Sequence, residues 1–225
     1  MRVLIGPDAD PDTDDGLREI YTPPRLPWLR ANMVSSVDGG ATGGDGRSGT
    51  VNTGVDQEVF QLLRRLADVI LVGAGTVRAE RYGPVQTPIL VVSGSGDVPP
   101  SARGGDPGAV RLATSESAPL LDEARAVLGE DHVYVVGETA VDLIGLVDRL
   151  HEDGFRHVLC EGGPSLLGDL VRAGVVDELC ATLAPRLLAG DGRRILTGPA
   201  LDVPLTLGSL LEEDGTLLAR WLVQS

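Results

Sequence analysis

Two glycine-bearing junctions, each between an apolar run and a helix-like stretch, constrain the fold more than any other feature of this sequence. The first is VILVGAGTVRAE at residues 69–80, and the second is HVLCEGGPSLLGDL at residues 157–170. Each apolar run predicts a buried strand that breaks at glycines and continues into a helix. Helix N-termini carry unpaired N–H groups and the positive end of the helix dipole, so they suit phosphate groups. Two such junctions indicate a protein that holds both ends of a phosphorylated cofactor.

Strand and helix patterns alternate along most of the chain, which predicts an α/β fold with a mainly parallel sheet covered on both faces. The expected strands are 28–36, 67–73, 87–93, 109–114, 132–137, 155–162 and 175–185. The expected helices are 55–67, a helix beginning at Gly75–Thr76, 117–129 with a Ser117 cap, 139–154 and 163–174. Residues 204–225 predict an antiparallel hairpin that turns at Asp214–Gly215. The Asp- and Pro-rich residues 6–27 predict an irregular arm, so we divide the chain into an arm, 1–24, and one domain, 25–225.

Composition narrows the class of protein. The chain has 225 residues, 42% of them hydrophobic, which is enough for one full core. Its net charge of −14 argues against nucleic acid and anionic membranes as partners. No apolar stretch approaches a membrane span, and the N-terminus does not resemble a signal peptide. Cys160 and Cys180 fall on expected strands and indicate reduced core thiols, so a cytoplasmic enzyme is expected.

The two junctions differ in how specifically their sequences indicate a ligand-binding site. VGAGTVR begins like a dinucleotide-binding fingerprint, but Arg78 stands where the third glycine is expected. The alternative explanation for its glycines is a close helix–strand contact, and a phosphate role is favoured. Thr76 adds a hydroxyl at the helix start. EGGPSLL is more specific, because paired glycines let a ligand approach the backbone and Pro164 pre-forms a helix start. The alternative is a tight turn with a solvated Glu161.

A glycine-rich segment, SSVDGGATGGDGRSGTVNTG, follows the strand at 28–36. We expect Asp38 and Arg47–Ser48 to face a site, and residues 43–46 to form a disordered surface loop. The sequence contains no motif for three other classes of site. The three histidines and two cysteines have no metal-ligand spacing, and neither the G-x-S-x-G elbow of α/β-hydrolases nor a P-loop is present.

Four motifs in order carry a family resemblance: S-V-D-G (36–39), R-S (47–48), L-R-x-x-A-D-V-I-L-V-G-A-G-T-V (63–77) and E-G-G-P-S-L (161–166). Over roughly 25–222 the chain resembles the pyrimidine reductase domain of riboflavin biosynthesis, which has a dihydrofolate-reductase-like fold. The deaminase domain often fused ahead of such reductases is absent, so a stand-alone reductase is expected.

The resemblance implies NADPH-dependent hydride transfer to the ribose C1′ of a phosphoribosylaminopyrimidine, and a homodimer as assembly. The implied cofactor-binding residues are Val34, Thr50, Gly73, Gly75, Thr76, Glu80, Ser93, Ser95, Gly162, Gly163, Pro164, Ser165 and Leu166. The implied substrate-binding residues are Asn32, Ser36, Arg47, Ser48, Arg64 and Glu161. Asp38 and Glu161 are the candidate catalytic carboxylates, and we expect one of them to have a raised pKa. By analogy with dihydrofolate reductase, the Gly162–Gly163 peptide bond is expected to be strained or cis.

One departure from the family pattern concerns the substrate phosphate. After G-x-G-T-V the family usually reads D-[DN]-P-x-L-T-x-R, whose arginine binds that phosphate, whereas this chain reads A-E-R-Y-G-P-V-Q-T. Thr87 stands near the place of the arginine, and Arg81 or Arg47 is the expected substitute. The alternatives are a reductase of another heterocycle such as dihydrofolate, and a non-catalytic NADPH-binding protein.

Overall fold

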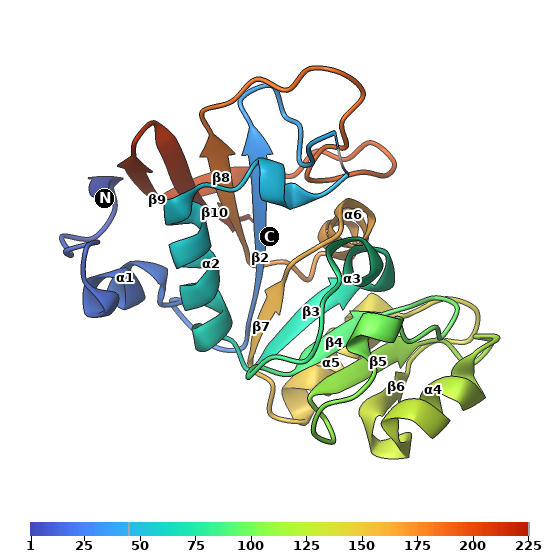
Figure 1. The fold of residues 1–225 in the computed structure, drawn as a ribbon. Helices are drawn as coiled ribbons and strands as arrows, with labels where there is room; N and C mark the ends of the chain where they lie inside the picture. Colours follow the sequence, from blue (N-terminus) through green and yellow to red (C-terminus); the bar gives the residue numbers. More distant parts are fainter. Residues whose placement is uncertain (45, 225) are drawn as a thin grey trace.

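A computed structural model describes residues 1–44 and 46–224 of the chain. Its centre is a ten-stranded sheet with the strand order β1-β9-β10-β8-β2-β7-β3-β4-β5-β6 (Figure 1). Strands β2 to β8 all run parallel to their neighbours within this set, as expected for strands that alternate with helices. These strands are β2 (Trp28–Ser36), β3 (Val69–Gly73), β4 (Ile89–Val92), β5 (Val110–Thr114), β6 (Val133–Val135), β7 (His157–Cys160) and β8 (Glu178–Ala184).

Helices cover both faces of the sheet, which confirms the predicted architecture. One core cluster contains buried residues of α1 (Asp14–Tyr21), α2 (Gly54–Leu66), α3 (Ala74–Glu80) and α4 (Leu121–Leu128). The opposite cluster contains residues of α5 (Leu143–Glu152) and α6 (Pro164–Arg172). Successive β3 residues alternate between the clusters: Ile70 and Val72 join the first, Val69 and Leu71 the second. The central strands are therefore buried on both sides.

The C-terminal hairpin extends the sheet with antiparallel strands. Strands β9 (Leu205–Glu213) and β10 (Thr216–Val223) pair with each other across the predicted turn, and β10 pairs with β8. The outer side of β9 is paired with β1 (Arg2–Ile5), which the sequence did not predict. The outer edge of the hairpin is thus paired within the chain.

The prediction of an irregular N-terminal arm is wrong, because residues 6–27 contain α1. The Thr13 hydroxyl caps this helix by accepting from the Gly16 N–H, and Leu17, Ile20 and Tyr21 are buried in the core. The helix was not predicted because the segment is rich in aspartate and proline, although its apolar residues recur at helical spacing.

Two other helices begin later than predicted. Helix α4 starts at Leu121 and not at Ser117, whose backbone N–H instead bonds the Glu138 carbonyl. Helix α5 starts at Leu143, because the Asp142 carboxylate accepts from the N–H groups of Ile144 and Gly145 and fixes the N-terminus there. Among the described residues, no helix is long and apolar enough to cross a membrane.

Candidate active site

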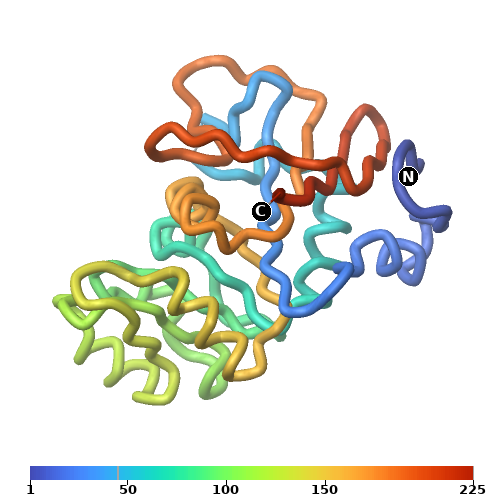
Figure 2. The backbone as a smooth tube through the Cα atoms, turned by 180° about the vertical axis from the view of Figure 1, so that it is seen from behind, coloured from blue at the N-terminus to red at the C-terminus, as the bar shows by residue number. Residues whose placement is uncertain are grey.

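A cavity of about 1050 Å³ opens at the carboxyl ends of the parallel strands, the usual place for ligands in open α/β sheets. Its walls come from β2, α2, the two glycine junctions after β3 and β7, and two loops. These loops, residues 37–53 and 185–204, lie side by side in Figures 1 and 2. Hydrogen bonds join them, among them one from the Ala41 N–H to the Arg193 carbonyl at 2.7 Å.

The two glycine junctions meet in this cavity. The Gly73 N–H at the end of β3 donates to the Gly162 carbonyl after β7 at 2.8 Å. A Cβ added at Gly163 would lie only 2.5 Å from the Thr76 Oγ1 on α3, so a larger residue here would displace the Thr76 hydroxyl from its position. Gly162 has φ +83°, and the Gly162–Gly163 bond is cis, which confirms that prediction.

A buried ion pair joins α2 to the second junction. The Arg64 Nε and Nη2 atoms donate to the two carboxylate oxygens of Glu161, both at 2.7 Å. The Glu161 side chain is 2% exposed and that of Arg64 is 16% exposed. Burial by itself lowers the pKa of Arg64, but hydrogen bonding and the charge of Glu161 offset it, so the pKa is raised. The pair therefore keeps a fixed, charged geometry at the cavity wall.

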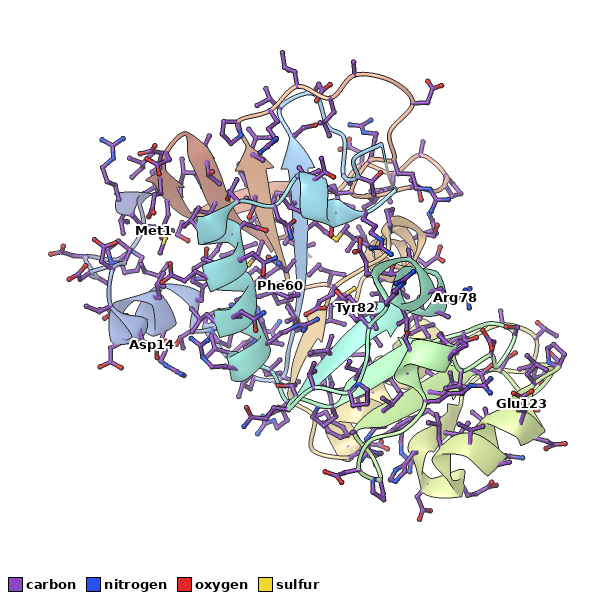
Figure 3. All side chains as sticks on the ribbon, viewed as in Figure 1. Met1, Asp14, Phe60, Arg78, Tyr82 and Glu123 are labelled. Carbon is purple, nitrogen blue, oxygen red and sulfur yellow. The ribbon has the colours of Figure 1, made fainter. Side chains whose placement is uncertain are left out.

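Two aromatic rings flank the Arg64 guanidinium. Its Cζ lies 4.3 Å from the centroid of Phe60 and 5.2 Å from that of Tyr82. Figure 3 shows Phe60 on the side of α2 that faces Tyr82. Burial raises the pKa of the Tyr82 hydroxyl, and the nearby negative charge of Glu161 raises it further. Tyr82 therefore stays a neutral hydrogen-bond donor.

Most of the residues predicted for the site do line this cavity. They are Asn32, Val34, Ser48, Arg64, Gly73, Gly75, Thr76, Glu80, Glu161, Gly163, Pro164, Ser165 and Leu166. Glu80 also accepts a hydrogen bond from the Ser48 N–H at 2.8 Å, which ties α3 to the glycine-rich loop. The remaining predicted residues lie outside its lining: Ser36, Asp38, Arg47, Thr50, Ser93, Ser95 and Gly162.

The structure does not bring Asp38 to the cavity as a candidate acid. Its carboxylate accepts from the Ser36 hydroxyl at 2.5 Å and from the backbone N–H groups of Leu188 and Ala189. The Ser36 hydrogen bond and then those two backbone donors lower the pKa of Asp38 to about 2, opposite to a raised pKa. Asp38 thus anchors the loop 185–204 against the end of β2, whereas the Ser36 hydroxyl accepts from the Gly40 N–H within the loop 37–53.

Ser93 and Ser95 follow β4 at the same edge of the sheet, with their hydroxyl oxygens 3.4 Å apart, beside the cavity and not in its wall. Of the surface loop expected at residues 43–46, the structure describes Gly43, Gly44 and Gly46, and all three line the cavity. Asp45 lies outside the described residues. The turn is held by Gly46 donating to the Gly43 carbonyl and by Gly43 packing against Thr50.

Several lining residues were missed by the sequence interpretation, chiefly Asn52, Asp56, Gln57, Phe60, Tyr82, Asp191 and Arg193. The signal on α2 was available: Asp56, Phe60 and Arg64 recur every four residues and share one helix face. Arg193 carried no such signal, since only the docking of loop 185–204 brings it to the site. Neither expected substitute arginine, Arg81 nor Arg47, lines the cavity.

The parallel sheet, the paired glycine junctions and the cavity at the strand ends define a dihydrofolate-reductase-like α/β protein. Dihydrofolate reductase from Enterococcus faecalis has the same fold, with a TM-score of 0.51 and 13% identity, covering 88% of this chain and 98% of that chain. The RibD C-terminal domain family matches residues 27–216, so the chain belongs to that family.

The chain is also similar to individual members of this group. A pyrimidine reductase-like protein from Corynebacterium diphtheriae superimposes with a TM-score of 0.79 and 25% identity, covering 93% of this chain and 98% of the other. The 2,5-diamino-6-ribosylamino-4(3H)-pyrimidinone 5′-phosphate reductase of Methanothermobacter thermautotrophicus is 30% identical over 78% of this chain and 86% of that protein. The RibD protein of Mycobacterium tuberculosis is 33% identical over 73% of this chain, and the match spans 44% of that protein.

Proposed function

We propose that this protein is an NADPH-dependent reductase that transfers hydride to the ribose C1′ of a phosphoribosylaminopyrimidine and opens the sugar to a ribityl chain. One observation carries the proposal: a single cavity joins both glycine junctions to the buried Arg64–Glu161 pair. The cavity volume, about 1050 Å³, is at the upper end for small-molecule sites and suits a dinucleotide beside a substrate. The names of the relatives from the riboflavin pathway support the same reaction.

The residues at the two junctions fit a dinucleotide. The absence of a side chain at Gly163 leaves open backbone where Thr76, Ser165 and the start of α6 face the cavity. Backbone N–H groups and hydroxyls at a helix start bind phosphate oxygens without a cationic side chain, which matters in a chain of net charge −14. When bound there, NADPH supplies the hydride. Ser93 and Ser95 lie within the same edge of the sheet and are proposed to contact the adenosine 2′-phosphate.

The role proposed for the Arg64–Glu161 pair is to stabilise the positive charge that the substrate carries during the reaction. The open form of the sugar presents a C1′ imine, which accepts hydride best when its nitrogen is protonated and positive. A Glu161 carboxylate held rigidly by Arg64 stabilises that positive charge at the cavity wall without reorganising. Tyr82 and Asn32 complete the polar lining as donors to the substrate. We keep Glu161 as the candidate catalytic carboxylate, and Asp38 positions the loop that carries Arg193.

Arg193 is the proposed substitute for the missing phosphate-binding arginine. It lines the cavity and its side chain is exposed, and within residues 1–44 and 46–224 no ion pair to it is found. An unpaired guanidinium at a cavity mouth is suited to bidentate contact with a phosphate.

Turnover measurements test the proposal. NADPH oxidation is followed with the phosphorylated ribosylaminopyrimidine, its dephosphorylated form and dihydrofolate. Faster turnover of the phosphorylated pyrimidine is expected. Reduction of dihydrofolate alone would make the protein a reductase of another heterocycle, and NADPH binding without any turnover would make it non-catalytic.

Two further expectations accompany the proposal. We expect a homodimer from the family resemblance, and a cytoplasmic location from the two reduced core cysteines, Cys160 and Cys180. Sedimentation of the purified chain tests the dimer, and a single species of about 23.5 kDa would refute it.

A further inference from the structure

The proposed reaction needs an acid at the ring oxygen of the sugar, in addition to the Arg64–Glu161 pair. Opening the sugar breaks the C1′–O4′ bond, and the electron pair of that bond leaves with O4′. The lone pair of the attached nitrogen forms the C1′=N bond, so this nitrogen becomes positive and keeps the hydrogen that it already carries. O4′ therefore has to receive its proton from another group in the cavity, because without a proton it closes the ring again.

Few groups in the cavity can supply this proton. The chain contains no lysine, and the described residues of the cavity lining include neither histidine nor cysteine. Both carboxylate oxygens of Glu161 accept hydrogen bonds from Arg64. Asp56 lies about 12 Å from Arg64 along the axis of α2, and Glu80 accepts from a backbone N–H of the glycine-rich loop. The acidic group that lines the cavity next to Glu161 is the Tyr82 hydroxyl.

The end of α3 brings Tyr82 to this position. Arg81 adopts a left-handed conformation with φ +58° and ends the helix, and the Tyr82 N–H donates to the Val77 carbonyl at 3.1 Å. The Tyr82 side chain is partly buried against the core cluster of α2 and α3, and its ring centroid lies 5.2 Å from the Arg64 Cζ. Because Arg64 is bound to Glu161, the tyrosine is held beside the carboxylate proposed to stabilise the reacting carbon.

The charges around Tyr82 suit a group that gives up its proton only to a strong base. Burial raises the pKa of Tyr82, the charge of Glu161 and hydrogen bonding to it raise it further, and the positive charge of Arg64 lowers it in part. Tyr82 therefore keeps its proton until a stronger base than a phenolate forms. The alkoxide that develops at O4′ is such a base. Arg64 then stabilises the tyrosinate that remains.

We propose that Tyr82 is the general acid of the reaction and that its hydroxyl protonates O4′ as the C1′–O4′ bond breaks. This inference rests on the proposed function and adds a catalytic residue to it. The proton and the electron pair at O4′ give a hydroxyl of the ribityl chain, C1′ accepts the hydride, and water returns a proton to the tyrosinate. The substrate thus gains one hydride and one proton in total. Tyr82 lies in the segment A-E-R-Y-G-P, where this chain departs from the family pattern.

The test is Tyr82→Phe, which removes the acidic hydroxyl and keeps a ring against Arg64. We expect kcat/KM for the phosphorylated ribosylaminopyrimidine to fall about 100-fold or more, whereas NADPH affinity, measured by fluorescence titration, stays at the wild-type value. Tyr134→Phe is the matched control. It removes the same group from β6, where the hydroxyl donates to Asp153 at 2.9 Å outside the cavity lining, and kcat/KM is expected to stay unchanged.

A primary isotope effect identifies the step that the substitution slows. Ring opening precedes hydride transfer, and loss of the acid slows both ring opening and its reversal. The open form of the sugar then reacts onward faster than it closes again, so hydride transfer no longer limits kcat/KM. We therefore expect Tyr82→Phe to use NADPH that carries deuterium at the transferable position as fast as it uses unlabelled NADPH.

The outcomes separate the role of Tyr82 from the proposed function. Wild-type kcat/KM in Tyr82→Phe, or a lowered kcat/KM with a clear primary isotope effect, would overturn the role of Tyr82 and leave the proposed function standing. If NADPH affinity falls as well, the isotope effect on the residual turnover still distinguishes loss of the acid from a displaced cofactor. A wild-type protein that oxidises no NADPH with the pyrimidine would overturn the proposed function and this role with it.

Discussion

The Arg64 side chain makes two kinds of contact at once, hydrogen bonds to a carboxylate and stacking on aromatic rings. Its guanidinium donates in parallel to both oxygens of Glu161 and stacks between Phe60 and Tyr82. Only a planar, forked cation meets both requirements, because an ammonium group cannot donate to two carboxylate oxygens in this geometry while lying flat on a ring.

Replacing Arg64 by Lys is therefore expected to lower kcat/KM about 10- to 100-fold, since the charge remains but the fork that orients Glu161 is lost. Steady-state NADPH oxidation measures the effect. Arg65→Lys is the matched control, because Arg65 is 48% exposed and pairs with Asp14 at the surface. An Arg64→Lys variant as active as wild type would show that Glu161 needs no orienting partner.

Arg193 is expected to act on the substrate phosphate alone. Arg193→Ala should raise KM for the phosphorylated substrate about tenfold and leave KM for the dephosphorylated compound unchanged, because one charge-assisted contact is removed. The neighbouring Arg194, which lies outside the cavity lining, serves as control. Equal effects on both compounds would mean that Arg193 holds the loop and not the phosphate.

At the scale of elements, the contact between α3 and the start of α6 sets how close the two glycine junctions lie to each other. We propose that this closeness lets both junctions bind one NADPH molecule. Gly163→Ala places a Cβ about 2.5 Å from the Thr76 Oγ1, so either the Thr76 hydroxyl rotates away from its position or one junction shifts. Overpacking of this kind costs about 1–3 kcal/mol, and we expect NADPH affinity to fall about tenfold or more. Fluorescence titration measures it. Gly54→Ala is the control, since its Cβ meets nothing within 4 Å. Unchanged NADPH affinity in Gly163→Ala would contradict the proposal that the two glycine junctions together bind the cofactor.

A buried charge cluster fastens α1 to the sheet. Glu178 on β8 accepts from Arg30 on β2, Arg220 on β10 and the Trp28 indole, and the two arginines donate to the Tyr21 and Ile20 carbonyls at the end of α1. Burial opposes the charge of Glu178, but Arg30 and Arg220 prevail and lower its pKa to about 2.

Glu178→Gln is expected to reduce the free energy of unfolding by about 3–5 kcal/mol, because it leaves two buried arginines without their counter-ion. The pKa of Glu178 is lower in the folded chain than the ordinary value of 4.5. Its contribution is therefore full above pH 4.5 and is lost as pH falls toward 2. Urea unfolding between pH 7 and pH 2 checks both points, with the exposed Asp14→Asn as control. A constant difference between Glu178→Gln and wild type across this range would contradict the shift.

At the scale of the molecule, local patterns predicted most of the fold. Strand β2 was predicted at its observed bounds, and the glycine junctions identified the edge of the sheet at which the cavity opens. Both were predictable because strand and helix periodicity and glycine breaks are properties of short segments. β1 was missed because its pairing with β9 joins residues about 200 positions apart. Asp38 was placed at the site for its motif, but its carboxylate is used by backbone groups of a distant loop. Arg193 depends on tertiary docking in the same way, because the loop 185–204 brings it to the cavity.

The measurement that tests the central claim most directly follows the hydride itself. NADPH carrying deuterium at the transferable position of its nicotinamide ring is incubated with the protein and the phosphorylated ribosylaminopyrimidine, and the product is examined by mass spectrometry and NMR. We predict one deuterium at C1′ of a ribityl product, formed in proportion to the NADPH consumed. NADPH consumption without deuterium at C1′, or a substrate recovered unchanged, would contradict the proposal that this cavity unites cofactor and substrate for hydride transfer.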